Sequence, residues 1–333
     1  MKKLLQSWIE ALWYKDQVIS TWLMPLSMLF LDVVRMRRFF YKIGIFKRTR
    51  LPVPVIIVGN ITVGGTGKTP LVIYLAQLLQ KTGYQPGIIS RGYGGKARKT
   101  PQLVTPDSQA AEVGDEALVI SRNSLCPVVV GPKRVESARQ LIEQQGCNVI
   151  LSDDGLQHYA LERTIEITVV DGQRRFGNGY CLPVGPLREP ISRIQEVDFI
   201  VVNGEPSEAN EYAMNISADQ AVNLSSNERQ PLSAFVAEPI HAVAGIGNPE
   251  RFFNLLKSFE LKPITHQFPD HYAYSLADLD FKDSRPILMT EKDAVKCQAF
   301  ADAKFWYVPI NSVLNKNFDD AFLALLKQRD TTR

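Results

Sequence analysis

The sequence predicts an α/β fold in which helices cover both faces of a mostly parallel sheet. Short, β-branched apolar runs recur along the chain without alternating between apolar and polar residues. This pattern is typical of strands that are buried on both faces of a parallel sheet. Stretches with helical spacing lie between several of these runs, as in strand-helix-strand units. The expected strands lie within residues 53–60, 86–92, 126–131, 147–154, 165–171 and 197–204, and the expected helices within 69–83, 115–124 and 134–146.

A change in sequence texture predicts a second, smaller α/β domain. After about residue 205 the chain becomes polar and carries few signals of buried strands. A new α/β pattern then starts with "IHAVAGIGNPERFFNLLKSF" and continues through "RPILMTEKDAVK" and "KFWYVPI". We therefore expect an N-terminal segment at 1–50, a first domain at 51–235 and a smaller C-terminal domain at 236–333.

The composition is that of a folded protein and excludes several classes. Of 333 residues, 45% are hydrophobic and 22% are charged, so a folded core is expected. The formal net charge of +3 is too small to indicate nucleic acid as a partner. The cysteines form no CxxC pair, which predicts reduced thiols in a cytosolic protein and neither a zinc site nor disulfides. They are Cys126, Cys147, Cys181 and Cys297. The N-terminus also lacks the pattern of a signal peptide.

The first 50 residues predict a helix that lies in a membrane interface. A charge-free run at 17–31, broken by Pro25, is shorter than the roughly 20 residues that a helix needs to cross a bilayer. Trp8, Trp13 and Trp22 precede a basic stretch, and aromatic and basic residues together suit the surface of an anionic membrane. The cations are Arg35, Arg37, Arg38, Lys42, Lys47, Arg48 and Arg50. The alternative is an amphipathic helix that packs on the protein's own core.

The stretch "VGNITVGGTGKTP" at 58–70 predicts a phosphate-binding loop between a strand and a helix. In the usual pattern, G-x-x-x-x-G-K-[ST], backbone N–H groups surround phosphate oxygens, the lysine reaches the β and γ phosphates, and the hydroxyl ligates Mg²⁺. Lys68 and Thr69 fit, whereas Thr62 stands at the first glycine position. Gly64 and Gly65 supply the flexible backbone that this position lacks. We assign nucleotide binding to Thr62, Val63, Gly64, Gly65, Thr66, Gly67, Lys68 and Thr69, which makes the fold P-loop NTPase-like.

Two other readings of this loop are weaker. One is a glycine-rich turn of a dinucleotide fold, as in a dehydrogenase, but such a turn does not explain Lys68 and Thr69. No clean G-x-G-x-x-G motif is present either. The "GGTGKT" stretch also resembles the loop of membrane-targeting and partitioning ATPases, "KGGxGKT". Their first lysine corresponds to Val63 in this chain, which disfavours a function that needs this lysine to reach across a dimer.

Other polar residues follow expected strands or begin expected helices. Asp153 and Asp154 directly follow an apolar run, where a P-loop enzyme needs a carboxylate for Mg²⁺. A solvated turn is the alternative for this pair. Asp115 and Glu116 begin a helix, where carboxylates also cap N–H groups. Further candidates in the same regions are Gln157 and His158, with Arg91, Arg134 and Arg188 as phosphate contacts. For His158, a site role and an ordinary structural role stay open.

As a set, these motifs resemble the tetraacyldisaccharide 4'-kinase family, the lipid A 4'-kinases of Gram-negative bacteria. The resemblance runs from about residue 50 to 300 and rests on "GNITVGGTGKTP", "SRGYGG", "VGDE", "GPKR", "DDGLQH", "LPVGPLREP", "GIGNPERFF", "FPDHYAYS" and "TEKDAVK". It implies that ATP phosphorylates the 4'-hydroxyl of a tetraacyldisaccharide 1-phosphate to give lipid IVA. It also implies two α/β/α domains that close over the nucleotide, and a peripheral or monotopic protein at the cytoplasmic face of the bacterial inner membrane. It implies no obligate protein partner.

The resemblance also implies residue roles. Lys68 and Thr69 would hold the phosphates and Mg²⁺, and Asp115 would be the base that takes the proton of the sugar hydroxyl. His271 of "DHY" would form a dyad with Asp115, although its sequence context alone indicates a surface histidine beside Pro269. Asp153, Asp154 and Gln157 would serve the metal. Arg91, Glu116, Arg134 and Arg188 would contact substrate or phosphate.

The main functional alternative is a membrane-associated P-loop nucleotide switch that recruits a partner protein. A guanine-reading N/T-K-x-D motif would favour a switch. In "TEKD" at 290–293, the lysine stands directly before the aspartate, so the spacing is wrong for that motif.

Overall fold

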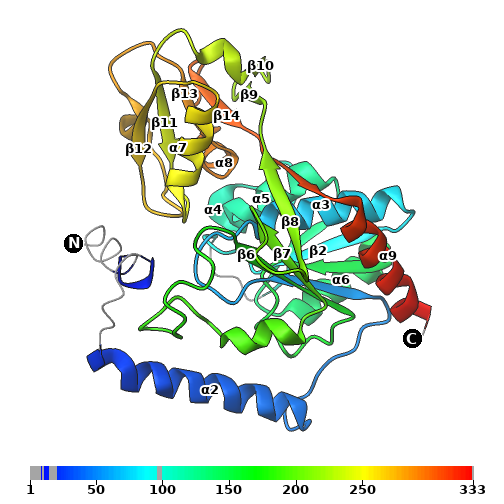
Figure 1. Cartoon of the computed structure of the whole chain (residues 1–333). Helices are drawn as coiled ribbons and strands as arrows, with labels where there is room; N and C mark the ends of the chain where they lie inside the picture. The colour runs from blue at the N-terminus through cyan, green and yellow to red at the C-terminus, as the bar shows by residue number, and fades with distance from the viewer. Residues whose placement is uncertain (1–8, 10, 15–20, 96–99, 332–333) are drawn as a thin grey trace.

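The computed structural model describes residues 9, 11–14, 21–95, 100–331 of the chain. Within these residues the chain forms two sheets that lie side by side, with helix α2 stretched along the outer edge of the larger unit (Figure 1). Trp8 and residues 17–20 of the charge-free run lie outside the described residues.

The larger sheet contains the expected N-terminal strands in a mostly parallel arrangement. Its strand order is β15-β8-β7-β6-β1-β5-β2-β4-β3. Only its two edge pairs, β3 with β4 and β8 with β15, are antiparallel among the named strands. The bounds are β1 Val55–Gly59, β2 Pro86–Ser90, β3 Gln102–Leu103, β4 Val128–Val130, β5 Val149–Ser152, β6 Ile165–Asp171, β7 Phe199–Asn203, β8 Glu211–Ser217 and β15 Asn311–Leu314. The predicted fold class is confirmed.

Helices cover both faces of this sheet because successive residues of β1 point to opposite sides. Ile56 and Val58 belong to a core shared with residues of α3, α5 and α9. Val55 and Ile57 belong to a second core on the other face, shared with α6 and with side chains of α2. The helix bounds are α3 Lys68–Lys81, α4 Ala110–Val113, α5 Asp115–Ser124, α6 Arg134–Gln145 and α9 Lys316–Thr331, with the 3-10 helix η2 at Ile191–Glu196.

The smaller sheet forms a second α/β unit with a core of its own. Its strand order is β10-β9-β14-β13-β11-β12, and its core joins the sheet to Phe252, Phe253 and Leu256 of α7. The bounds are β9 Gln220–Asn223, β10 Arg229–Pro231, η3 Leu232–Phe235, β11 Ile240–Ala244, α7 Pro249–Ser258, β12 Pro263–Gln267, η4 Leu276–Leu279, β13 Ile287–Thr290, α8 Glu291–Cys297 and β14 Phe305–Val308.

The chain passes between the two sheets twice. It leaves the larger sheet after β8 and returns from β14 to β15. The expected division at residue 236 differs from this pairing in two places: β9 and β10 precede it but pair in the smaller sheet, and β15 follows it but pairs in the larger one. Helix α9 also returns to the core of the larger sheet. We propose residues 220–308 as the second domain.

Helix α2 (Met24–Lys42), preceded by η1 (Thr21–Leu23), packs on the first domain along one side only. The Ser27 hydroxyl donates to the carbonyl oxygen of Cys181 at 2.7 Å, and Leu31 packs on the core of the sheet. The opposite side exposes large apolar side chains, among them Met28 at 66% and Leu29 at 61%. In the part of the chain that the structure describes, no helix has the length and apolar character needed to span a membrane.

The described residues that precede α2 lie beside the phosphate loop. The indole Nε1 of Trp13 donates to the carbonyl oxygen of Pro183 at 3.1 Å, and the Tyr14 hydroxyl lies 3.4 Å from the carbonyl oxygen of Val63. The four cysteines are free thiols in buried positions.

Candidate active site

The phosphate loop connects β1 to α3 in the middle of the larger sheet. Thr62, at the position of the usual first glycine, forms an isolated β-bridge to Leu187, so this position needs no positive φ. Gly64 and Gly67 instead have φ values of 109° and 99°, which glycine adopts without strain. A Cβ at Gly67 would lie 2.5 Å from Nδ2 of Asn203, the group that donates to the carbonyl oxygen of Thr66 at 3.0 Å. Asn203 of β7 therefore fixes the backbone of the loop through this hydrogen bond.

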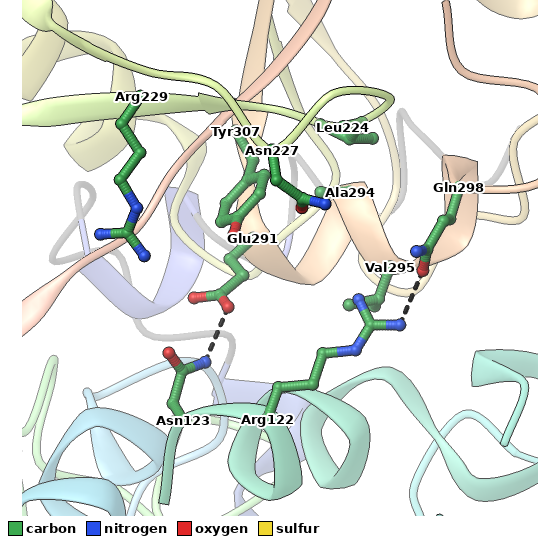
Figure 2. A pocket seen from close by; sticks show the side chains of 10 residues that line it. All are labelled: Arg122, Asn123, Leu224, Asn227, Arg229, Glu291, Ala294, Val295, Gln298 and Tyr307. Atoms are coloured by element: carbon green, nitrogen blue, oxygen red, sulfur yellow. Dashed lines mark hydrogen bonds between the residues drawn. The ribbon is translucent and has the colours of Figure 1, made fainter. Parts of the chain in front are cut away.

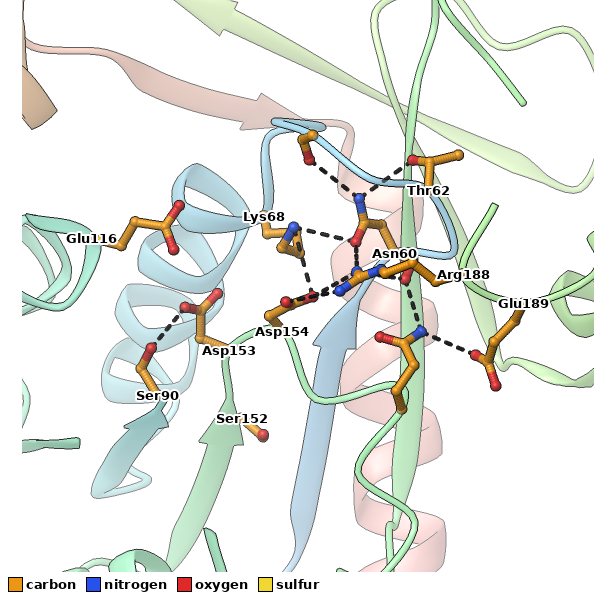
Figure 3. A network of polar contacts seen from close by, with 12 residues as sticks. Asn60, Thr62, Lys68, Ser90, Glu116, Ser152, Asp153, Asp154, Arg188 and Glu189 are labelled. Atoms are coloured by element: carbon orange, nitrogen blue, oxygen red, sulfur yellow. Dashed lines mark hydrogen bonds and ion pairs between the residues drawn. The ribbon is translucent and has the colours of Figure 1, made fainter. Parts of the chain in front are cut away.

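Lys68 begins α3 and points toward the acidic end of β5 (Figure 3). Its Nζ donates to Oδ1 of Asn60 at 3.2 Å and lies 3.6 Å from Oδ1 of Asp154. Arg188 contacts the same Asp154 carboxylate and the carbonyl oxygen of Asn60. Two cations and one carboxylate thus meet at the open end of the loop.

Asp153 and Asp154 occupy opposite environments. Asp153 is 1% exposed, and burial, together with the neighbouring carboxylates of Glu116 and Asp154, raises its pKa to about 6. Its Oδ2 accepts from the Ser90 hydroxyl at 3.1 Å, and its buried Oδ1 has no hydrogen-bond partner among the described residues. Burial also opposes the ionisation of Asp154, but Lys68 and the arginines offset it and hold that pKa below its usual range.

Two other candidates, Arg134 and Gln157, form hydrogen bonds around the turn that carries Asp153 and Asp154. Arg134 is buried and donates to the Ser152 hydroxyl at 2.6 Å and to the carbonyl oxygen of Asp154 at 2.9 Å. Gln157 donates to the carbonyl oxygen of Asn60 at 3.1 Å and to Glu189 at 3.0 Å.

Two further candidates, His158 and Arg91, lie close to the same turn. Burial and nearby arginines lower the pKa of His158 to about 4, so its ring is neutral near pH 7. Arg91 lies on an exposed loop after β2.

Asp115 and His271 come together although 156 residues separate them in the chain. His271 Nδ1 lies 2.9 Å from Oδ1 and 3.0 Å from Oδ2 of Asp115. Asp115 also accepts the N–H of the adjacent Glu116 at 2.8 Å, whereas no described side chain caps the N-terminus of α5. Asp115 begins α5 of the first domain and His271 lies between β12 and η4 of the second. The pair therefore joins the two domains.

Two glycines of the first domain allow close packing beside the Asp115–His271 pair. Gly114 has a φ of 89°, and a Cβ there would lie 2.4 Å from the carbonyl oxygen of Tyr93. A Cβ at Gly94 would lie 3.1 Å from Nδ1 of His271. The rings of Tyr93 and His271 are 4.8 Å apart in an edge arrangement. The "SRGYGG" loop thus contacts His271 directly.

Two lysines of α8 contribute to the charge balance around the pair. Lys292 Nζ donates to Glu116, and Lys296 Nζ lies 3.6 Å from Oδ2 of Asp115. Burial opposes the ionisation of Asp115, but the hydrogen bond from His271 and the charges of Lys292 and Lys296 lower its pKa. The hydrogen bond to Asp115 raises the pKa of His271 against the effect of burial. The charged forms of both groups are thereby favoured.

The second domain also reaches the phosphate loop. A Cβ at Gly247 would lie 3.0 Å from the backbone nitrogen of Gly65. Arg251 of α7 donates to Oδ1 of Asn203, and its Nη1 lies 3.7 Å from Asp171. Residues of both domains therefore surround the loop.

A cavity lies elsewhere along the domain contact. It has a volume of about 200 Å³ and lies beside α5 and α8 rather than at the phosphate loop (Figure 2). Across it, Arg122 donates to Gln298 and Asn123 donates to Glu291, both at 2.7 Å. None of the residues predicted for the site lines this cavity.

Sequence reasoning missed several polar residues of this site. Asn60 lies within the quoted loop stretch but was assigned no role, yet it contacts Lys68, Arg188 and Gln157. Lys292 and Lys296 lie in "TEKDAVK", a motif to which the sequence assigned no role. Its repetition of lysine four residues apart, on one face of a short helix, is the signal that could have revealed them.

A phosphate loop beside an acidic strand end, facing a paired carboxylate and histidine, defines a P-loop phosphotransferase. The LpxK family model, described as tetraacyldisaccharide-1-P 4'-kinase, matches residues 19–327. The chain belongs to this family. The resemblance drawn from the motifs and the expectation of an enzyme that transfers phosphate to an alcohol are thereby confirmed.

Individual relatives agree with this assignment over nearly the whole chain. A tetraacyldisaccharide 4'-kinase from Nitrosococcus oceani is 53% identical, covering 97% of this chain and 95% of that protein. One from Methylobacillus flagellatus is 49% identical, covering 96% of each. Among solved structures, LpxK from Aquifex aeolicus in complex with ATP superimposes with a TM-score of 0.78 at 28% identity, covering 92% of this chain and 99% of that one. These relatives do not favour the nucleotide-switch alternative.

Proposed function

We propose that this protein transfers the γ-phosphate of ATP to the 4'-hydroxyl of a tetraacyldisaccharide 1-phosphate and so forms lipid IVA in lipid A biosynthesis. The observation that carries the proposal is the Asp115–His271 pair, 2.9 Å apart across the two domains, in a chain of the tetraacyldisaccharide-1-P 4'-kinase family. A paired carboxylate can orient an acceptor hydroxyl, which a protein that only binds nucleotide does not need.

The phosphate loop would hold the triphosphate of ATP. Backbone N–H groups of residues 64–67 and the N-terminus of α3 provide donors and a positive dipole end for anionic oxygens, whereas the N–H of Val63 donates to the carbonyl oxygen of Pro186. Lys68 would contact the β and γ phosphates, and its contact with Asp154 would keep it at the mouth of the loop. Arg188, next to the same carboxylate, is placed to neutralise charge on the transferred group.

Mg²⁺ would be held by Thr69, Asp153 and Asp154 together with phosphate oxygens. The donor set fits this ion, because Mg²⁺ prefers oxygen ligands and needs only one or two carboxylates besides phosphate and water. The buried Oδ1 of Asp153 has no hydrogen-bond partner among the described residues, which suits an atom that awaits a cation. When bound, the ion would neutralise charge between the β and γ phosphates. Gln157 would orient this end of the site through Asn60.

Asp115 would act as the base. The acceptor oxygen attacks the γ-phosphorus, the bond to the β-γ bridging oxygen breaks, and the acceptor proton passes to a carboxylate oxygen of Asp115. His271 Nδ1 would keep that carboxylate oriented and ionised before the transfer. Most of the rate enhancement would come from positioning and charge neutralisation. Contact between the domains would exclude water and limit ATP hydrolysis.

The other predicted contacts belong to the same proposal. Arg134 would act by fixing the turn that carries Asp153 and Asp154, since its donors are used by that turn. Glu116, next to Asp115 in α5, and Arg91, on the exposed loop after β2, would contact the glycolipid's polar part.

We also propose that α2 holds the protein at the cytoplasmic face of the inner membrane. Its outward side carries Met28 and Leu29, each more than half exposed, as is Trp22 of the preceding helix η1, and cations follow along α2. Apolar side chains flanked by cations suit an anionic lipid surface. A membrane-bound lipid acceptor would then meet the enzyme without leaving the bilayer.

Incubation of the protein with γ-labelled ATP, Mg²⁺ and a tetraacyldisaccharide 1-phosphate tests the main proposal. Label should appear in a lipid that carries one more phosphate. A matched acceptor whose 4'-hydroxyl is replaced by hydrogen is the control and should stay unlabelled. Label release only as inorganic phosphate, with no labelled lipid, would exclude the kinase reaction.

A further inference from the structure

Asp293 is a buried carboxylate at the centre of the second domain's contribution to the site. It lies on α8, and its side chain is fully buried. Oδ2 accepts the backbone N–H of Gly245 at 2.9 Å and the Thr290 hydroxyl at 2.6 Å. Oδ1 accepts the Tyr274 hydroxyl at 3.1 Å and lies 2.8 Å from Nζ of Lys296. One carboxylate thus connects four separate groups.

Three of these connections lead to the site. Gly245 stands two residues before Gly247, which approaches the phosphate loop. Tyr274 stands three residues after His271 in the same segment. Lys296 lies 3.6 Å from Asp115. Among the described residues, Asp293 forms no hydrogen bond or ion pair with Asp115 or His271 itself.

The packing around Asp293 leaves little freedom. A Cβ at Gly245 would lie 2.5 Å from the Tyr274 hydroxyl and 3.0 Å from Oδ1 of Asp293. A fully buried carboxylate is costly unless donors and a cation compensate for lost hydration. The Gly245 N–H, the Tyr274 hydroxyl and Lys296 must therefore be in place together, or the carboxylate is left unpaired.

We propose that Asp293 is a positioning residue that fixes the phosphate-loop contact, His271 and Lys296 of the second domain in one mutual arrangement. The inference rests on the proposed kinase function only for its kinetic test. It gives the "TEKD" stretch a role: Thr290 caps α8 through the backbone N–H of Asp293, and Asp293 joins that helix to the two neighbouring loops. Misplacement of a catalytic group by about 1 Å can cost about 100-fold in rate.

The kinetic test compares Asp293→Asn with Tyr274→Phe in the full-length protein. We expect kcat to fall by about 10- to 100-fold for Asp293→Asn and by a smaller factor for Tyr274→Phe, which keeps the buried ring. In a His271→Ala background the same substitutions should cost much less, because residues that act through one another have non-additive effects. Equal costs in both backgrounds, or an unchanged kcat, would overturn the proposal.

Asp198→Asn is the matched control. The Asp198 carboxylate also accepts a backbone N–H, from Glu166 at 2.9 Å, and pairs with Arg329 at 2.6 Å, but on the first domain away from the dyad. This variant should lose stability, keep kcat near the parent value, and show the same cost with or without His271.

A second readout does not need enzymatic activity. The chain has four histidines, so the ring signal of His271 can be assigned by NMR of histidine-labelled protein through single substitutions. Asp293→Asn and Tyr274→Phe should both shift this signal and its titration midpoint, whereas Asp198→Asn should not. If the wild-type protein labelled no lipid but these shifts appeared, the kinase proposal would fail and the positioning role would stand. If Asp293→Asn did not fold, Tyr274→Phe would carry the test, and an unmoved His271 signal would refute it.

Discussion

Arg188 contacts both carboxylate oxygens of Asp154, with Nη1 3.0 Å from Oδ2 and Nη2 2.8 Å from Oδ1. A planar guanidinium can make this paired contact and an ammonium group cannot. We expect Arg188→Lys to lower kcat by about 10- to 100-fold, since a hydrogen bond to a charged group contributes about 1.5–3 kcal/mol. Steady-state kinetics at saturating ATP measure this. Arg285→Lys, at an exposed pair on the second domain, is the control, and equal activity of both variants would contradict the role of Arg188.

Replacement of the proposed base should separate binding from turnover. Asp115→Asn keeps the size of the side chain and its contact region with His271 but removes the proton acceptor. We expect kcat to fall by about 100- to 10,000-fold while the Kd for ATP, measured by calorimetry, changes little. Near-normal turnover would exclude Asp115 as the base.

The Asp115–His271 pair should stabilise the protein within a limited pH window. The pKa of Asp115 is lowered from 3.8, so its contribution is present above pH 3.8 and is lost as the pH falls through the lowered value. The pKa of His271 is raised from 6.5, so its contribution is complete below pH 6.5 and is lost as the pH rises through the raised value. The maximum therefore lies between about pH 4 and 6.5.

Thermal unfolding of the wild type and of His271→Gln at pH 5.5 and pH 9 measures this window. The difference in Tm between the two proteins should be larger at pH 5.5 than at pH 9. A difference that does not change with pH would mean that the pair contributes no titratable stability.

A charge on the outward side of α2 should release the protein from membranes. Leu29 is 61% exposed on α2, and Leu29→Glu would place a carboxylate against anionic lipid. We expect sedimentation with anionic vesicles to fall several-fold. Leu276→Glu, at a leucine of the second domain that is 54% exposed, is the matched control and should sediment like the wild type. Equal loss in both variants would contradict a specific role of α2.

The phosphate loop should not tolerate a side chain at Gly67. Its φ of 99° is strained for other residues, and a Cβ would lie 2.5 Å from Nδ2 of Asn203. We expect Gly67→Ala to weaken ATP binding by about 10-fold or more, the equivalent of at least about 1.4 kcal/mol. Gly83→Ala, where φ is also positive but no atom lies within 4 Å of the added Cβ, separates backbone strain from the collision with Asn203. Equal ATP affinity in the two variants would remove that collision as the cause.

The elements that the sequence predicted best carry their signal locally. The run at 53–60 became β1, buried at every position, because a strand covered on both faces needs an unbroken apolar sequence. The helix expected at 69–83 became α3, and the helix expected at 115–124 became α5 with the same bounds. Strands β8, β9 and β10 were not predicted, because they lie in the polar stretch and β8 is buried only at Glu211 and Met214.

The site was predictable where a motif carries the chemistry and not where tertiary contacts do. The roles of Lys68, Asp153 and Asp154 could be predicted, because a phosphate-loop motif indicates the phosphate-binding lysine and the end of a buried strand indicates the metal-binding carboxylates. The pairing of Asp115 with His271 needed the family resemblance, since their 156-residue separation leaves no local trace. The role of Asn60 could not be predicted, because it depends on contacts with Lys68, Arg188 and Gln157 that form only in the folded chain.

The return of β15 and α9 to the larger sheet determines the order in which this chain can fold. Most residues of the core of the larger sheet precede residue 220. Phe318 and Phe322 of α9 complete this core, together with a few other residues of α8, β15 and α9. On the ribosome, the nucleotide-binding unit therefore stays unfinished until nearly the whole polypeptide has emerged. The inserted unit, whose core is formed by contiguous sequence, can fold first. Premature termination within the last 30 or so residues would leave an ordered small unit attached to an incomplete large one, a species that exposes apolar sheet and is prone to aggregate.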